Sequence, residues 1–218
     1  AAAAIGAKYM ATKDIEAVGI IGTGRIGRGS LACLAEELKF DKVYAHSGRK
    51  RDDSFPKIMG EHVNAEIVAV DSVKEVMARS NVLVTGTYAQ EPVVKGKWLR
   101  KGTHISGMGA DGHMKAEMDS EVFRKSSRIV VDSEKCYTIG EIARSFETGA
   151  ITRNDIQGKI GHVVAGKITG RDTPEDITIF ESDGTHIQSG AVVHLIYKKV
   201  KEMGLGKEIE SSDFFVNS

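Results

Sequence analysis

Three glycines near the N-terminus have the spacing G-x-G-x-x-G, which can bring a backbone close to phosphate groups. An apolar run over 17–21 precedes them and apolar residues at helical spacing follow, so the motif lies between a predicted strand and a predicted helix. In that context the first glycine allows a tight turn, the second admits a pyrophosphate, and the third lets the helix pack on the strand. The N–H groups that begin the helix would face the phosphates. The motif therefore favours a dinucleotide site over a purely structural turn, with contacts from Gly22, Thr23, Gly24, Arg25, Ile26 and Gly27.

The end of the second predicted strand, about 20 residues after the glycines, indicates which dinucleotide is favoured. NAD sites usually hold Asp or Glu there to bind the ribose 2′-hydroxyl, whereas this chain has Ser47 and then three consecutive cations. A hydroxyl and a guanidinium suit a 2′-phosphate better. NAD(H) stays possible because Asp52 and Asp53 follow, and the cations could form an ordinary solvated loop. We therefore expect NADP(H) in preference to NAD(H), with contacts from Ser47, Arg49 and Lys50.

Three later loops follow predicted strands, at the edge of an open α/β sheet where ligands bind. The strand over 81–84 leads into a loop rich in threonine and glycine, for which a plain turn before Pro92 is the alternative. The strand over 103–106 leads into a glycine-rich loop, and the strand over 177–180 leads into Ser-Asp-Gly. The further cofactor contacts that we expect from these loops are Thr85, Gly86, Thr87, Met108, Gly109, Ser182, Asp183 and Gly184.

Short β-rich runs alternate with helical runs, which predicts an α/β fold with a doubly wound parallel sheet. A helix over 1–10 comes before this pattern, and a long amphipathic helix over 186–203 follows it. The polar, glycine-bearing stretch 155–166 carries no predicted element. The expected strands lie over 17–21, 43–46, 66–70, 81–84, 103–106, 128–132 and 177–180, with helices over 25–38 and 72–78.

The composition of the 218 residues is that of an ordinary globular chain, and its formal net charge is zero. The balanced charge gives no reason to propose a nucleic acid or an anionic membrane as partner. No apolar run reaches the roughly 18 residues of a membrane span, and no signal peptide is visible, so we expect a cytoplasmic protein. Cys33 and Cys136 fit a reducing compartment and are expected to be buried. No metal is expected, because the candidate ligands lack ligand spacing: His104, His113 and His186.

Several segments together resemble a known family. In order along the chain they read AAAAIGAKYMA, GIIGTGRIG, TGTYAQEPV, WLRKGTHISGMGADGHMKAEMD, IVVDS, GE, AGKITGR and ITIFESDGTHIQ. Their order and spacing resemble the ornithine cyclodeaminase and mu-crystallin family over nearly the whole chain. The resemblance implies a Rossmann-like NAD(P)-binding domain over 17–186. It also implies a homodimer and an incomplete substrate and dimerisation domain, to which 1–16 and the helix and tail at 187–218 would belong.

The resemblance also assigns roles to residues. Asp111 matches the family's catalytic aspartate, although on the residues alone an Asp that bridges a loop is the plainer interpretation. A carboxylate there can take a proton from a substrate amine, activate the water that attacks an imine, or stabilise an iminium ion. Lys115 and Glu117 match the K-x-E that follows and are expected to shape the loop. Met114 and Ser189 depart from the family pattern, which points to a different substrate or an altered activity.

The activity that the resemblance implies is NAD(P)-dependent hydride transfer at the α-carbon of a small amino acid or its imine. The enzyme would be an amino-acid dehydrogenase or a ketimine reductase. One alternative is an ammonia lyase that converts ornithine to proline, and another is a non-catalytic, crystallin-like protein that binds NADP(H). A purely structural dimer module is disfavoured by the intact glycine turn. The family's Arg and Lys for the substrate carboxylate would lie upstream of Ala1, so they have no match in this chain.

Overall fold

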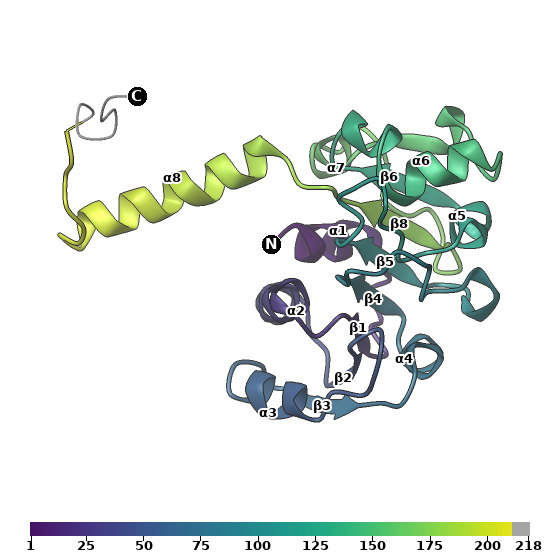
Figure 1. The fold of residues 1–218 in the computed structure, drawn as a ribbon, viewed down its shortest axis with the longest axis horizontal. Helices are drawn as coiled ribbons and strands as arrows, with labels where there is room; N and C mark the ends of the chain where they lie inside the picture. Colours follow the sequence, from purple (N-terminus) through teal and green to yellow (C-terminus); the bar gives the residue numbers. More distant parts are fainter. Residues whose placement is uncertain (211–218) are drawn as a thin grey trace. The chain divides into compact units, whose positions relative to one another are not determined.

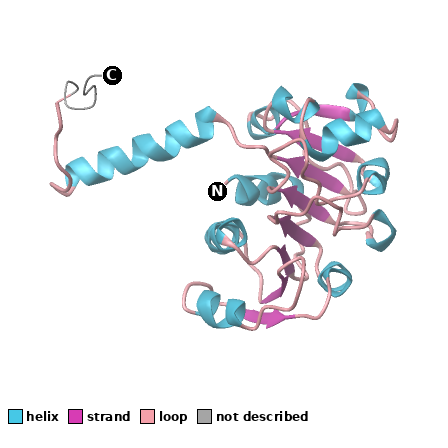
Figure 2. Cartoon of the chain, viewed as in Figure 1, coloured by secondary structure: helices cyan, strands magenta, loops and turns pink. Residues whose placement is uncertain are grey.

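The computed structural model describes residues 1–210, in which eight parallel strands form one sheet (Figures 1 and 2). The strands are β1 (Val18–Ile21), β2 (Lys42–His46), β3 (Glu66–Ala69), β4 (Val82–Thr85), β5 (His104–Gly107), β6 (Arg128–Val131), β7 (Ile156–Lys159) and β8 (Thr178–Glu181). Their order in the sheet is β3-β2-β1-β4-β5-β8-β6-β7. The chain builds outward from β1 through β2 to β3 and then returns to β4 on the other side. This reversal confirms the predicted doubly wound sheet and creates a switch point between β1 and β4.

Helices cover both faces of this sheet, as Figure 1 shows for the part of the chain up to residue 184. The α-helices are α1 (Ala2–Met10), α2 (Arg25–Glu37), α3 (Ser54–Gly60), α4 (Val73–Arg79), α5 (Ser120–Lys125), α6 (Gly140–Glu147), α7 (Ile160–Val164) and α8 (His186–Glu202). Three single-turn 3₁₀ helices are η1 (Gly96–Trp98), η2 (Glu134–Tyr137) and η3 (Arg153–Asp155).

Alternate residues of the central strands feed two hydrophobic cores. Val18 and Ile20 of β1 pack with the apolar side chains of α2 and α3, whereas Ile21 belongs to the core under α4, α5 and α6. Gly19 faces the second core, and a Cβ atom there would lie under 3.0 Å from Leu83 and from Val76 of α4. Strands buried on both faces need continuous apolar runs, which explains the sequence of β1 and β4.

Helix α1 packs against α2, β5 and β8. Its small residues allow this close approach, because a Cβ atom at Gly6 would lie under 3.0 Å from the ring of Phe180 in β8. Ser106 Oγ of β5 donates a hydrogen bond to the Ala3 carbonyl, and Thr178 Oγ1 of β8 donates one to the Met10 carbonyl. Contacts thus join α1 to a compact unit over Ala1–Gly184. The assignment of residues 1–16 to a substrate domain stays a prediction.

A second unit begins at Thr185 and contains α8. Thr185 Oγ1 caps this helix by accepting a hydrogen bond from the Gln188 N–H, at 3.2 Å. Its apolar side chains, among them Ile187, Val193 and Leu195, are exposed. The expectation that residues 187–218 pack on a further domain stays a prediction, and Phe214 and Phe215 lie outside the described residues. Within residues 1–210, no helix is long and apolar enough to cross a membrane.

The elements that the sequence prediction missed include α3, β7 and α7. In α3, Phe55 and Met59 are buried one helical turn apart, and Asp52 Oδ1 accepts hydrogen bonds from the N–H and the hydroxyl of Ser54, the first residue of the helix. β7 and α7 occupy the stretch that carried no predicted element. β7 is an edge strand with the sequence IQGK, in which only Ile156 is buried, so it lacks the apolar pattern of the other strands. The prediction of seven strands was therefore wrong, because the sheet also contains β7.

The two cysteines are both free. Cys136 is buried, as expected, and burial raises the pKa of its thiol. Cys33 is only half-buried on α2, so the expectation that it is buried was wrong. Cys33 packs against the margin of the core that the fully buried residues of α2, such as Leu34, fill.

Candidate active site

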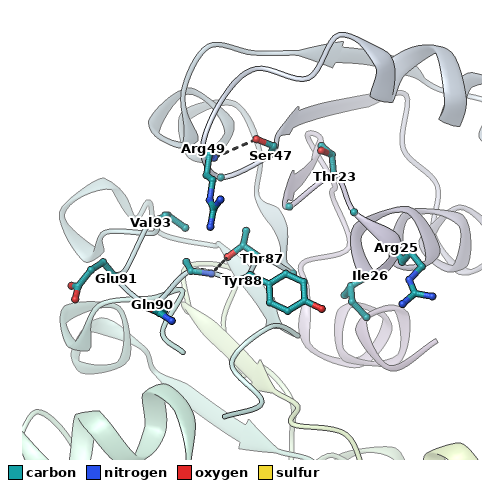
Figure 3. Close-up of a pocket in the computed structure, with 15 residues that line it drawn as sticks. Thr23, Arg25, Ile26, Ser47, Arg49, Thr87, Tyr88, Gln90, Glu91 and Val93 are labelled. Atoms are coloured by element: carbon teal, nitrogen blue, oxygen red, sulfur yellow. Dashed lines mark hydrogen bonds between the residues drawn. The ribbon is translucent and has the colours of Figure 1, made fainter. Parts of the chain in front are cut away.

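A cavity of about 950 Å3 lies at the carboxyl ends of β1, β2 and β4, at the switch point of the sheet (Figure 3). Its volume lies within the range of about 300–1,000 Å3 that is typical of ligand sites. Three loops line it, through residues 22–26, residues 47–49, and residues 86–91 with Val93. The structure thus brings together the glycine motif, the loop after β2 and the loop after β4.

The three glycines of the motif have three different surroundings. Gly22 has a φ angle of 105°, which favours glycine, and a Cβ atom there would collide with the Gly86 carbonyl. A Cβ atom at Gly27 would collide with the Gly22 carbonyl, so α2 can approach β1 only because this residue is glycine. Around Gly24 no atom lies within 4 Å of the Cβ position. A pyrophosphate fits this open space, where the first N–H groups of α2 have no side-chain cap.

The loop after β2 presents a cation to the cavity. Ser47 Oγ accepts hydrogen bonds from the backbone N–H groups of Arg49 and Lys50, at 3.3 and 3.0 Å, and donates one to the Lys50 carbonyl. The hydroxyl therefore holds the turn together. Arg49 extends from this turn into the cavity (Figure 3), and no described carboxylate pairs with it. Lys50 does not line the cavity.

Asp52 joins this loop to the glycine motif. Its Oδ2 atom accepts a hydrogen bond from Thr23 Oγ1 at 2.6 Å, and its Oδ1 atom accepts one from Ser54 Oγ at 2.6 Å. The hydrogen bond from the Ser54 hydroxyl lowers the pKa of Asp52 most, and the one from the Thr23 hydroxyl lowers it next. Because its carboxylate is bound to these donors, Asp52 braces the loop and is absent from the cavity lining.

The loop after β4 divides into a buried and an exposed part. Thr85 is buried, donates to Glu117 Oε2 at 2.9 Å, and does not line the cavity. Gly86 and Thr87 do line it, and the Thr87 N–H donates to Glu117 Oε1 at 2.5 Å. Tyr88 is 79% exposed at the rim. Gly48 and the lining residues after Thr87 are not among the cofactor contacts predicted from the sequence, although the latter belong to the loop that follows β4.

Asp111 lies on the loop after β5, outside the cavity lining. Its Oδ1 atom lies 2.5 Å from Lys115 Nζ, and the same ammonium lies 4.4 Å from the ring centre of Tyr88. Lys115 therefore connects the candidate catalytic carboxylate to a side chain of the cavity rim. Met108 and Gly109, on the same loop, pack against protein atoms and do not line the cavity.

The loop after β8 also lies outside the cavity lining. Ser182 Oγ and the Gly184 N–H both donate to Asp132 Oδ2, at 2.7 and 2.9 Å. The pKa of Asp183 is raised to about 6, mainly by burial and in smaller part by the charges of Asp132 and Asp111. Asp183 and Asp111 therefore lie close enough to repel each other, which agrees with the adjacency of β5 and β8 in the sheet.

Three glutamates are buried behind these loops: Glu117, Glu141 and Glu181. Burial raises the pKa of each carboxyl group, and repulsion between neighbours raises those of Glu141 and Glu181 further. The segments K-x-E and GE contain two of these residues, but glutamate is rarely fully buried, so neither segment predicts this placement.

The histidines show no shared site. His104 is buried between Thr178 Oγ1 and Ser106 Oγ, at 2.8 and 3.0 Å, and burial lowers its pKa to about 3. Among residues 1–210, no three His, Cys, Asp or Glu side chains are grouped to hold a metal ion. The expectation of no metal stays a prediction.

Comparison with known proteins decides the family. The sequence model of the ornithine cyclodeaminase/mu-crystallin family matches residues 1–204. The chain belongs to this family. Alanine dehydrogenase of Archaeoglobus fulgidus is 36% identical over 210 residues, which are 96% of this chain and 65% of that protein.

Two solved structures of this ornithine cyclodeaminase/mu-crystallin family are similar to the chain. The Δ1-pyrroline-2-carboxylate reductase of Thermococcus litoralis, in complex with NADH and L-proline, has a TM-score of 0.88 and 34% identity. It is matched over 95% of this chain and 65% of its own. An archaeal alanine dehydrogenase dimer with bound NAD has a TM-score of 0.87 and 35% identity, over 96% and 65% of the two chains. This chain therefore spans less than two thirds of the length of these relatives.

Proposed function

We propose that this chain binds a nicotinamide dinucleotide and acts as part of an oxidoreductase. The enzyme would transfer hydride at the α-carbon of a small amino acid or its imine. The glycine loop carries the proposal, because Gly24 leaves open the space that a pyrophosphate needs at the switch point of the sheet. Relatives with NADH and proline or with NAD bound support the substrate class. An amino-acid dehydrogenase or a ketimine reductase fits these observations.

The residues of this chain have separate proposed roles. The backbone of residues 22–26 would hold the pyrophosphate, and Arg49 would lie beside the adenine ribose. When bound, the cofactor supplies or accepts the hydride. Asp111 would take the proton of the substrate amine or activate the attacking water. Lys115, which is bound to Asp111, would orient that carboxylate.

For the cofactor we propose NADP(H) in preference to NAD(H). Arg49 lines the cavity with its guanidinium unpaired among the described residues, and no carboxylate stands at the end of β2. A guanidinium binds a phosphate through charge-assisted hydrogen bonds. The proposed hydroxyl contact of Ser47 is weaker support, because its Oγ atom is engaged in the turn. Fluorescence titration with NADPH and NADH tests the preference, and tighter binding of NADH would refute it.

We also propose a homodimer in the cytoplasm. The archaeal alanine dehydrogenase relative is a dimer, and two free cysteines suit a reducing compartment. Size-exclusion chromatography of the full-length protein with light scattering tests the dimer. A monomeric mass at working concentration would contradict it.

The activity itself is tested by steady-state assay of the full-length protein. Alanine, ornithine, pyruvate with ammonia, and cyclic imines cover the candidate substrates. We expect Asp111→Asn to lower kcat at least about 100-fold and to leave dinucleotide affinity unchanged, because general acid–base groups contribute about 10²–10⁴-fold. Asp41→Asn, at an exposed position after α2, is the matched control. Normal turnover by Asp111→Asn would remove the catalytic assignment, and dinucleotide binding without any turnover would favour the non-catalytic alternative.

A further inference from the structure

The buried glutamates come from three separate segments. Glu117 precedes α5, Glu141 lies in α6, and Glu181 ends β8. The exposed fraction of each is at most 2%, and no Lys or Arg of the described chain forms an ion pair with any of them. Uncompensated charge is expensive to bury, so three adjacent carboxylates cannot all be ionised.

The hydrogen bonds show where the charge is tolerated. Glu117 accepts from the Thr87 N–H, from Thr85 Oγ1 and from the backbone of Gly109. Glu141 Oε2 accepts from two backbone N–H groups, those of Glu117 and Met118, at 2.6 and 2.8 Å. Donors of this kind stabilise a carboxylate.

Glu181 has the opposite surroundings. Neither of its oxygens meets an N–H or hydroxyl donor, and the same is true of Glu141 Oε1. The two carboxyl groups lie within hydrogen-bonding reach of each other. Two acceptors that face each other in a buried site form a hydrogen bond only if one of them carries a proton.

Two glycines make room for this arrangement: Gly107, which ends β5, and Gly109, which lies in the loop after it. A Cβ atom at Gly107 would lie under 3.0 Å from Glu181 Oε2, and one at Gly109 would lie under 3.0 Å from Glu117 Oε2. Gly140, with a φ angle of 69°, starts α6 directly against the Ala110 carbonyl and so brings Glu141 behind the same loop. The backbone is thus shaped around the carboxyl groups.

We propose that Glu181 is protonated and uncharged, that its O–H group donates a hydrogen bond to the carboxylate of Glu141, and that this pair positions the carboxylate of Glu117. Glu117 in turn joins Thr87, on the cavity lining, to the loop that leads to Asp111. All three glutamates are positioning residues. The part of this inference that concerns dinucleotide affinity rests on the proposed function.

The arrangement makes the site sensitive to alkaline pH. Loss of the shared proton would leave two carboxylates facing each other, with Glu117 and Asp183 as their charged neighbours. Beside Glu181, the carboxylate of Asp132 and the thiol of Cys136 offer no positive charge, and the charge of Lys135 lowers the pKa of Asp183. The repulsion would displace Glu117 and release Thr87.

Titration of dinucleotide affinity against pH, from about pH 6 to about pH 10, tests this in the full-length protein. We expect the wild-type affinity for NADPH to fall at least about tenfold at the alkaline end, where the pair ionises. Glu181→Gln keeps a donor toward Glu141 that cannot ionise, so its affinity should stay constant. Glu147→Gln, on the exposed side of α6, is the control and should follow wild type. If the NADPH affinity of Glu181→Gln fell at alkaline pH as much as that of wild type, the proposal would be overturned.

Two measurements are independent of the cofactor. The infrared spectrum of wild type should contain the C=O band of a protonated carboxyl group, and this band should be absent from the spectrum of Glu181→Gln. Amide exchange at Thr87 should be faster in Glu117→Gln, because an amide NH2 group would face the N–H donors. If wild type binds no dinucleotide, the proposed function fails, and these two results still decide the inference. An unchanged band in Glu181→Gln would refute the shared proton.

Discussion

Two glycine-x-glycine segments at the carboxyl edge of the sheet have opposite uses. Gly22 and Gly24 belong to the cavity, and the space beside Gly24 is open. Gly107 and Gly109 lie outside the lining, and the space beside them is filled by the carboxyl oxygens of the protein itself. The same residue type thus creates room for a ligand in one region and room for buried acid in the other.

Glycine spacing alone therefore does not identify a phosphate site. What separates the two segments is the next element. Gly24 leads directly into α2, whose first N–H groups are uncapped, whereas Gly109 leads into a loop that returns with Glu117. We therefore propose that the first region binds the phosphates and that the second positions the loops.

A side chain at position 24 should abolish most of the dinucleotide affinity of the first region and leave the second region intact. Gly24→Val places a side chain in the open space, so dinucleotide affinity should fall at least about 100-fold, as expected when a bulky group blocks backbone contacts worth several hydrogen bonds. The backbone there is extended, so the melting temperature should change little. Gly29→Ala, at an exposed and open position of α2, is the control. Equal affinity in Gly24→Val and wild type would remove the pyrophosphate from this loop.

The second region should respond in stability. Gly109→Ala forces a Cβ atom against Glu117 Oε2 and the Thr87 carbonyl, and overpacking of this kind costs about 1–3 kcal/mol. Urea denaturation measures the change in the free energy of unfolding. Gly112→Ala, on the same loop with open space around it, should be neutral. If Gly109→Ala weakened dinucleotide binding and left stability intact, Gly109 would belong with the ligand-facing glycines.

The sequence identified the first region more fully than the second, for a physical reason. The strand, turn and helix around Gly22 to Gly27 are contiguous, so local patterns indicated each glycine's surroundings. Thr85 and Gly109 were predicted to contact the cofactor, whereas the structure places both against Glu117, which is 32 residues from Thr85. No spacing rule reports such a long-range contact. Their predicted cofactor contacts stay predictions.

The fold shows the same division between local and long-range information. Strands buried on both faces are mainly apolar and were found from the sequence, as β1 and β4 illustrate. β7 has a single buried residue and depends on pairing with β6, and Ile129 of β6 also donates its N–H to the Gln157 side chain. Its existence is a tertiary effect, so the apolar pattern could not reveal it.

The pH dependence of stability should show the carboxyl pair directly. Because burial raises the pKa of Glu181 well above 4.5, the folded chain retains a proton that the unfolded chain has lost, so stability falls as pH rises. His104, whose pKa is lowered to about 3, acts in the opposite sense only up to its ordinary value of 6.5. Above that value, the slopes for wild type and Glu181→Gln should differ by about 1.4 kcal/mol per pH unit. Parallel denaturation curves across this range would contradict a retained proton.

The smallest expected effect concerns the loop after β2, where a cation and not a glycine distinguishes the ligand. Arg49→Ala should weaken NADPH binding about tenfold, because a hydrogen bond to a charged group contributes about 1.5–3 kcal/mol, while NADH binding should stay nearly constant. Lys50→Ala, next to Arg49 and outside the cavity lining, is the matched control. Equal losses for NADPH and NADH in Arg49→Ala would mean that the guanidinium contacts a part common to both dinucleotides. The preference for NADP(H) would then lose its structural basis, whereas the contrast between the two glycine segments would stand.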